Sequence, residues 1–210
     1  MKGAKTVLLT NAPPQEVEGW KRRILVAMGI LPKQRICTTL GKNDKPVDGY
    51  VHGARFLPYP VEVKDFSLRE RTINLGDRVK LLCVGSLTND RKRPWMVLEA
   101  IALAGIQDLV DVTFIGLGNE ESTGAQKIAA VSSEMGFSDF SMKYNIPHHR
   151  MYDLYKDYDV LVHPARKEPF GMVVLEAMAA GLALITSDEV RVSSCLGNSI
   201  TGFTFKANKN

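Results

Sequence analysis

The sequence has few cysteines. Its 210 residues include three of them, Cys37, Cys83 and Cys195, and no two stand in a CxxC pair. So small and scattered a set excludes a disulfide framework and favours the reducing environment of the cytosol. Cys83 lies in the apolar run LLCVG, which predicts a buried thiol.

Long apolar runs are also absent. No run reaches the roughly 18 residues that a membrane-spanning helix needs. The apolar part of MKGAKTVLLT, at the start of the chain, is too short for a signal peptide. The sequence therefore predicts a soluble, cytoplasmic chain, and it leaves a peripheral membrane contact open.

The excess of charge of one sign is also small. The net charge is +4, and the densest basic cluster is the short run Arg91–Arg93. Because no stripe of basic residues with interleaved aromatics occurs, we expect no nucleic-acid surface. A mild positive charge still allows anionic small molecules as ligands, and no spacing typical of metal ligands is present.

Apolar runs alternate with helical patterns from Val79 onward. Strands are predicted at residues 79–85, 110–116, 140–144, 159–164, 182–186 and 200–205, and helices at 92–105, 121–136, 148–158 and 172–181. This alternation predicts an α/β fold, with a mostly parallel sheet covered by helices on both faces. Ligands of such sheets bind beyond the carboxyl ends of the strands. The segments GSLTND, GLGNEE, NIPHH and PARKEPFG all fall there.

The first 60 residues show a weaker pattern. Strands are expected at 6–10, 35–40 and 53–60, with a helix whose apolar stripe runs from Val17 to Met28. Residues 61–78 are charged and have little periodicity, which is typical of a linker. The predicted domains are a short α/β segment at 1–60, a linker at 61–78 and an α/β domain at 79–210 that could be truncated at its carboxyl end.

The segment HPARKEPFGMVVLEAMAAG carries the strongest functional pattern. Gly171 and the helix predicted to follow it would present free backbone amides and the positive end of a helix dipole, which suits a phosphate. Glu168 and Glu176 flank this helix start, and a carboxylate can accept hydrogen bonds from two adjacent hydroxyls. Two such carboxylates around an anion site suggest a nucleotide diphosphate sugar as the ligand.

The same segment resembles a known family. EPFGMVVLEAMAAG is similar to the E-x7-E signature of retaining GT-B glycosyltransferases, most closely glycosyltransferase family 4. DLYKDYDVLVHPAR, LLCVGSLTNDRKRPWMVLEAIA, VTFIGLG and NSITGFTF resemble further segments of that family, in the family's order. The resemblance covers roughly Val79 to Phe205, and it implies the Rossmann-like, nucleotide-sugar-binding half of a GT-B enzyme.

The resemblance also implies roles for individual residues. Glu168 would contact the hydroxyls of the donor sugar, Glu176 would contact those of the ribose, and Lys92 would neutralise the departing phosphate. Glu168 and Lys92 are the predicted catalytic residues. The loops around them supply the other predicted donor-binding residues, namely Gly85, Ser86, Ile146, Phe170, Gly171, Met172 and Val173. Among these, the amides of the last three would meet the diphosphate, and the backbone near Ile146 would read the base.

The implied reaction is transfer of a hexosyl group, with retention of configuration, to a hydroxyl of a sugar, lipid-linked or other acceptor. It needs no cofactor and no metal, and it would serve the assembly of a polysaccharide, glycolipid or glycan. Residues 1–60 are too short for the family's acceptor domain. We therefore expect the chain to be the donor-binding half of a larger enzyme, without that enzyme's N-terminal GT-B domain.

Several alternatives stay open at this level. Ser86 stands where the family usually has an arginine, and Arg91 or Arg93 could substitute for it. A non-catalytic nucleotide-sugar-binding module and, less favoured, a GT-B-shaped epimerase remain alternatives. His148 and His149 are expected in a surface turn. His163 could line the crevice or be a half-buried, hydrogen-bonded histidine.

Overall fold

The computed structural model describes residues 7–10, 19–29, 34–39, 47–48, 50–63, 66, 72, 74, 76–195 and 202–207, with only the backbone at 7–10 and 194–195. Contacts divide the chain into two compact units, residues 1–60 and 61–210. Much of the predicted linker at 61–78 lies outside the described residues. Phe66, which falls within it, is buried in the core of the second unit.

In its described residues, the first unit contains a four-stranded sheet and one helix. Its elements are β1 (Val7–Thr10), α1 (Gly19–Ala27), β2 (Gln34–Cys37), β3 (Tyr50–Val51) and β4 (Ala54–Phe56). The sheet order is β1-β2-β4-β3, and its pairs are parallel except β3 with β4. The predicted helix forms, but the side chains of Trp20, Ile24 and Met28 on its apolar stripe are exposed.

The second unit is a parallel α/β structure, as predicted. In chain order its elements are β5 (Val79–Val84), α2 (Met96–Ala104), the 3-10 helix η2 (Gln107–Leu109), β6 (Val110–Gly116), α3 (Thr123–Met135), β7 (Phe140–Tyr144), α4 (His148–Leu154), the 3-10 helix η3 (Tyr155–Asp157), β8 (Val160–His163), α5 (Met172–Ala179), β9 (Ala183–Ser187), the 3-10 helix η4 (Arg191–Cys195) and β10 (Gly202–Phe205). The sheet order is β10-β9-β8-β5-β6-β7, and every pair is parallel.

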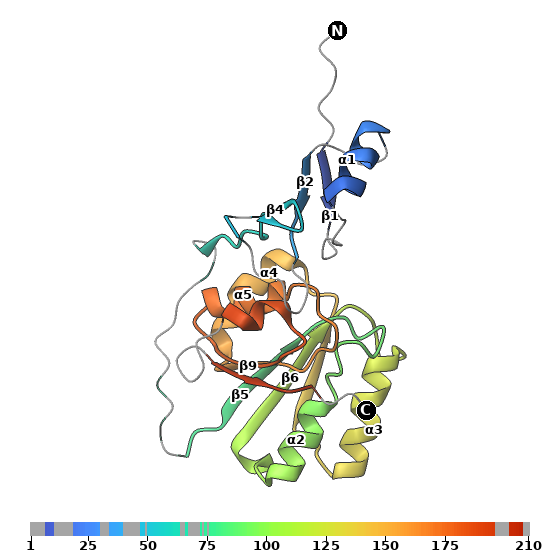
Figure 1. Cartoon of the computed structure of the whole chain (residues 1–210). Coiled ribbons are helices and arrows are strands. Elements are labelled where there is room, and N and C mark those ends of the chain that lie inside the picture. Colours follow the sequence, from blue (N-terminus) through green and yellow to red (C-terminus); the bar gives the residue numbers. More distant parts are fainter. Residues whose placement is uncertain are drawn as a thin grey trace. The chain divides into compact units, whose positions relative to one another are not determined.

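Alternating side chains of β5 build a core on each face of this sheet. Leu82 packs with residues of α4 and α5, whereas Leu81 and Cys83 pack with residues of α2 and α3. Figure 1 shows the two pairs of helices on opposite faces. The Cys83 thiol is buried as expected, and this burial raises its pKa to about 12, so it stays protonated at neutral pH.

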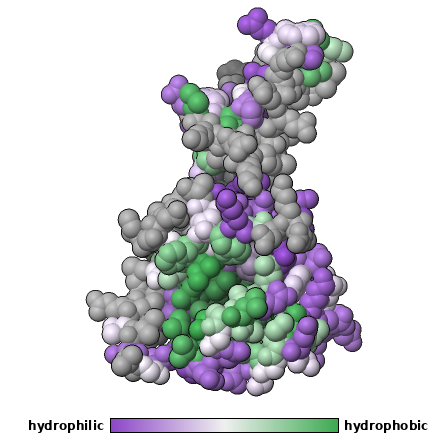
Figure 2. Space-filling model, turned by 60° about the horizontal axis from the view of Figure 1, so that its bottom comes forward, coloured by the Kyte–Doolittle hydropathy of each residue, from purple (hydrophilic) through white to green (hydrophobic). Residues whose placement is uncertain are grey.

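Large apolar side chains also reach the surface of the second unit. Leu103 of α2, Leu117 after β6 and Phe203 of the edge strand β10 are all exposed. Figure 2 shows a broad hydrophobic area on one side of this unit. Among the residues that the structure describes, none of the helices has the length and apolar character needed to cross a bilayer.

Candidate active site

The loops that follow β5, β7 and β8 lie at the carboxyl ends of the parallel strands, where backbone hydrogen bonds tie the loop after β7 to the end of β6 and the loop after β8 to the loop after β5. The amide of Asn145, after β7, donates to the carbonyl of Gly116 at 2.9 Å. The amide of Arg166, after β8, donates to the carbonyl of Arg91, after β5, at 2.8 Å. The loop segments predicted to bind a ligand are therefore held together at the carboxyl ends of the strands.

Helix α5 begins at this edge with a residue that has to be glycine. Gly171 is the N-cap and has a φ of 99°, a left-handed conformation that residues with a side chain rarely adopt. A Cβ added here would lie 2.6 Å from Cγ1 of Val190. No side chain caps the helix. The amides of Met172 and Val173 in its first turn therefore have no capping side chain, as an anion site requires.

Two cations hold the Glu168 carboxylate in the loop before α5. Lys92 donates to Oε2 of Glu168 through Nζ, and Nη1 of Arg91 lies 3.2 Å from the same oxygen. The stem of Lys92 packs against Gly85, where an added Cβ would lie 3.0 Å from Cγ of Lys92. The predicted role of Lys92 thus depends on the glycine at position 85, because a side chain there would displace the side chain of Lys92.

Electrostatics favour the ionised form of Glu168. The residue is only 8% exposed. Burial alone would raise the pKa of Glu168, but the ion pair and hydrogen bond with Lys92, aided by Arg91, lower it overall. The site therefore keeps a buried negative charge that is balanced by two positive ones.

His163, the last residue of β8, lies beneath this ion cluster. It is 1% exposed, and its Nε2 has no hydrogen-bond partner and lies 4.0 Å from Oε2 of Glu168. The ring hydrogen-bonds the backbone of Val84. It is thus more deeply buried than the half-buried histidine expected as an alternative.

The environment of His163 gives a pH-dependent stability. Burial, followed by the positive charge of Lys92, lowers the pKa of His163 from 6.5 to about 4. Between these pH values the unfolded chain binds a proton that the folded protein does not, so acidification should lower the free energy of unfolding, by roughly 3 kcal/mol for this shift. Urea unfolding at pH 7 and pH 4.5 should show that His163→Asn removes most of this loss.

A matched control is His149→Asn, because His149 is exposed on α4. This variant should keep the wild-type pH dependence. Ionised Glu168 loses its stabilising contribution only at lower pH, below the ordinary carboxyl pKa of 4.5. If His163→Asn has the same stability profile as the wild type between pH 7 and 4.5, the assignment of a buried neutral imidazole is wrong.

The second glutamate of the pattern is held by a tyrosine and a histidine. Glu176 lies on α5 and is 5% exposed. The hydroxyl of Tyr155 donates to its Oε2 at 2.8 Å, and Nε2 of His148 lies 3.0 Å from its Oε1. Nδ1 of His148 in turn lies 3.2 Å from the hydroxyl of Tyr152. His148 begins α4 and has the exposed position expected of it, but it also bonds a predicted site residue.

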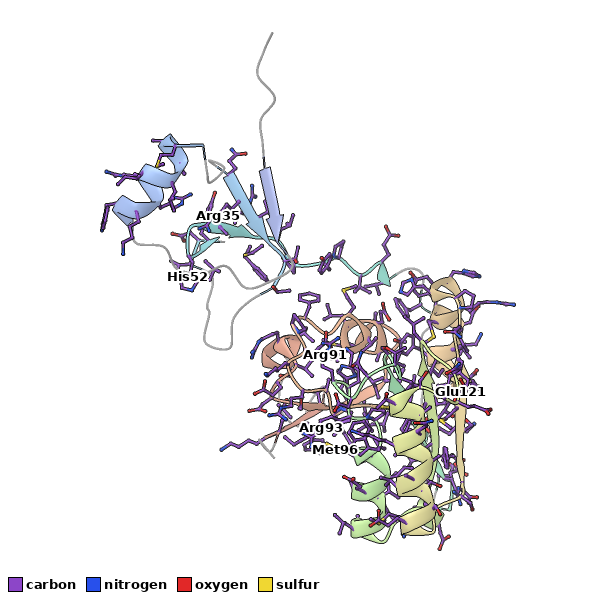
Figure 3. All side chains as sticks on the ribbon, turned by 90° about the vertical axis from the view of Figure 1, so that its right-hand side faces the viewer. Arg35, His52, Arg91, Arg93, Met96 and Glu121 are labelled. Atoms are coloured by element: carbon purple, nitrogen blue, oxygen red, sulfur yellow. The ribbon has the colours of Figure 1, made fainter. Side chains whose placement is uncertain are left out.

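Other predicted residues lie on the surrounding loops. The hydroxyl of Ser86 pairs with that of Thr88 at 2.7 Å, and Ile146 is half-buried against the core beneath α4 and α5. Phe170 accepts a hydrogen bond from the amide of Val192 at 3.0 Å through its carbonyl. Figure 3 shows Arg91 and Arg93 in the second unit near the start of α2.

The loop GLGNEE is closed by protein contacts. The side-chain amide of Asn145 bonds both the N–H and the carbonyl of Gly118, at 3.1 and 2.8 Å. The hydroxyl of Ser122 accepts from the amide of Asn119 just before α3. These contacts describe a loop and helix start. Among the described residues, no group of three or more His, Cys, Asp or Glu side chains could hold a metal ion.

Sequence reasoning missed part of this arrangement. It proposed Glu168, Lys92 and Glu176 as site residues, but it did not pair Glu168 with Arg91 or assign any site role to Tyr155. The distance along the chain explains this, since Tyr155 and Glu176 are 21 positions apart and Arg91 and Glu168 are 77 apart. For Arg91 and Glu168 the available signal was topological, because the loops after the neighbouring strands β5 and β8 both lie at the carboxyl ends of the sheet.

A family model matches most of the chain. Residues 65–210 match the model of the family Glycosyl transferases group 1. No curated protein sequence matches the chain significantly.

Solved structures share the fold at low sequence identity. Sucrose-phosphate synthase from Thermosynechococcus elongatus has a TM-score of 0.66 at 21% identity, over 90% of this chain and 49% of that one. HepE of Anabaena, in complex with UDP and glucose, has a TM-score of 0.66 at 12% identity, over 95% and 57%. The C-terminal domain of a group 1 glycosyl transferase (LpcC) from Francisella tularensis has a TM-score of 0.59 at 16% identity, over 70% and 80%.

The chain spans only about half the length of the first two of these structures. Their likeness to it is one of fold, namely the Rossmann-like half of a GT-B protein. The family match covers well over half of the sequence. The chain therefore belongs to the glycosyl transferases group 1 family.

Proposed function

We propose that this chain forms the donor site of a retaining hexosyltransferase of glycosyltransferase family 4, which uses a nucleotide diphosphate sugar. The observation that carries the proposal is the start of α5, where an uncapped helix terminus is flanked by two buried carboxylates, Glu168 and Glu176. An anion site between two groups that accept hydroxyl hydrogen bonds suits a diphosphate with a diol on either side.

Charge balance suggests how the donor would engage Glu168. Lys92 and Arg91 now neutralise this carboxylate. A diphosphate at the α5 terminus would compete for the ammonium of Lys92, and Glu168 would then be able to accept hydrogen bonds from hydroxyls of the sugar. Binding of the donor and exposure of the sugar-orienting carboxylate would therefore be one event.

The same groups would stabilise the departing diphosphate. The bond from the anomeric carbon to the phosphate oxygen breaks, and the acceptor oxygen bonds to that carbon on the same face. The acceptor's proton passes to the departing phosphate. Lys92 and the amides of Met172 and Val173 would offset the negative charge that develops there, which is electrostatic catalysis without a metal. Glu168 would orient the sugar and would form no covalent bond to it.

The wider setting follows from the family and from one neighbour. HepE is described in complex with UDP and glucose, which favours a nucleotide sugar as the ligand here too. The acceptor would be a hydroxyl of a sugar, a lipid-linked sugar or another molecule, and its site would belong to an N-terminal GT-B domain. We place the enzyme in the cytoplasm, with peripheral contact to a membrane where the acceptor is a lipid.

A non-catalytic donor-binding module is the second candidate. It is favoured by Ser86, whose hydroxyl pairs with Thr88 where the resemblance leads one to expect an arginine. Arg91 is the arginine that the structure brings to Glu168. Release of nucleoside diphosphate during sugar transfer, with the anomeric configuration of the product read by NMR, separates the two candidates.

Thermal-shift titration with UDP-glucose, GDP-mannose and ADP-glucose tests the donor site itself. At ligand concentrations tenfold above Kd, we expect at least one donor to raise the Tm by about 3–6 °C. Glu176→Ala should abolish the shift, because it removes the carboxylate that accepts from the ribose. Glu134→Ala, which changes an exposed glutamate of α3, is the matched control and should retain it. A panel without any shift at millimolar ligand would contradict the proposed function.

A further inference from the structure

The surroundings of Glu176 specify which of its lone pairs remain for a ligand. A carboxylate accepts about four hydrogen bonds, two at each oxygen. Tyr155 donates to Oε2 and His148 approaches Oε1, so the protein occupies one position on each oxygen. One position per oxygen is left, and two acceptors on one carboxylate match the two hydroxyls of a vicinal diol.

Both protein partners are fixed as donors. Tyr155 is fully buried, and burial, followed by the charge of Glu176, raises the pKa of its hydroxyl well above the ordinary value. Because a carboxylate only accepts, the Nε2 of His148 that faces it carries the proton. The hydroxyl of Tyr152 can then donate to the other ring nitrogen, 3.2 Å away. The hydrogen bonds from Tyr152 to His148 and from His148 to Glu176 thus form a consistent series of donors and acceptors.

The two partners lie on different sides of the carboxylate. Tyr155 holds it from the core, where its ring packs against Phe66. His148 holds it from the solvent side, since the His148 side chain is 65% exposed and that of Glu176 only 7%. A ligand therefore approaches Glu176 beside the imidazole, which can move without disturbing the core.

We propose that Tyr155 and His148 are positioning residues that aim Glu176 at the 2′ and 3′ hydroxyls of a ribose, so that the site selects ribonucleotides over deoxyribonucleotides. This inference rests on the proposed function and deepens it. A ligand without these hydroxyls would leave two acceptor positions of a buried carboxylate unpaired, which costs affinity.

Calorimetric titration of the intact chain with UDP, GDP and ADP, and with their 2′,3′-dideoxy counterparts, tests this inference. We expect the wild type to prefer the ribose form of the best-bound nucleotide by about 10- to 100-fold. Tyr155→Phe deletes one oxygen and should reduce that preference at least threefold while leaving the dideoxy affinity unchanged. His148→Ala should act in the same direction, and His148→Gln, which keeps an N–H donor, should restore part of the preference.

The matched control is Tyr158→Phe. Tyr158 is also buried, but its hydroxyl lies 3.4 Å from Nζ of Lys143. Two outcomes would overturn this inference and leave the proposed function standing. One is an equal loss of ribose and dideoxy affinity in both Tyr155→Phe and His148→Ala, and the other is an unchanged ribose preference in both. His148→Ala changes an exposed side chain, so it decides the matter if Tyr155→Phe does not fold. Failure of the wild type to bind any of the nucleotides would overturn the proposed function as well.

Discussion

In the enzyme that contains this donor half together with its N-terminal GT-B domain, replacing Lys92 with methionine should lower the rate of sugar transfer by about 10²- to 10³-fold, the usual effect of removing one preorganised group that stabilises a developing charge. Lys92 pairs with Glu168, in the loop that leads to the α5 terminus, and only 14% of its side chain is exposed. The variant should also weaken the binding of a nucleoside diphosphate by about tenfold or more, because a charge-assisted hydrogen bond is lost. Steady-state kinetics and calorimetry measure the two effects.

Loss of Lys92 also leaves Glu168 with one cation fewer, so stability must be separated from chemistry. Lys127→Met is the matched control, because it removes the same charge from an exposed lysine that contacts Asp90 and the ring of Trp95. That variant should keep transfer within about twofold of the wild type. Binding of the free nucleoside, which has no phosphate, should be unchanged by Lys92→Met. A Lys92→Met protein that folds and transfers sugar within fivefold of the wild-type rate would rule out the assigned role.

The fold of the second unit could be predicted because its local signals agree with one another. The run VKLLCVG reads as a strand covered on both faces, and Leu81, Leu82 and Cys83 alternate between the two cores as such a strand requires. Gly105 was expected to end a helix, and it does so in the left-handed conformation. Buried apolar strands and helix-ending glycines alternate along the whole unit, and together they are compatible with only one arrangement of strands.

The first unit was less predictable because the apolar residues of its helical pattern are not buried in the structure. Val17, Trp20, Ile24, Ala27 and Met28 form an apolar stripe in the sequence, and the helix α1 does form over Gly19–Ala27. Position 17 lies outside the described residues. Trp20, Ile24 and Met28 are 49–65% exposed, so periodicity identified the helix but not what it packs against.

The candidate site divides in the same way. The residues on the E-x7-E segment and its helix start follow one another along the chain, so spacing alone could group them. The partners that tune the carboxylates come from other loops. Arg91 reaches Glu168 from the loop after β5, and Tyr155 reaches Glu176 from a 3-10 helix before β8. Such pairs depend on loop lengths and side-chain rotamers, which a sequence pattern does not specify.

Substitution of Gly171 by alanine should destabilise the protein by about 2–6 kcal/mol, from two separate causes. A non-glycine residue at a φ of 99° is strained by roughly 1–3 kcal/mol. In addition, its Cβ would lie 2.6 Å from Cγ1 of Val190 and 3.1 Å from Cγ1 of Val192, an overpacking that costs about 1–3 kcal/mol. Urea unfolding gives the free energy, and donor titration of the folded fraction should show weaker diphosphate binding because α5 would begin out of place.

Gly136→Ala separates the two causes. Gly136 also has a positive φ, of 63°, but an added Cβ there meets nothing within 4 Å, so this variant should cost only about 1 kcal/mol. In a Val190→Ala background, the further cost of Gly171→Ala should shrink by about 1–2 kcal/mol, because one of the two close contacts is gone. Equal costs for Gly171→Ala and Gly136→Ala would mean that α5 can start without close contact to the 190–192 segment. The anion site would then owe its position to the strand β8 and its loop instead.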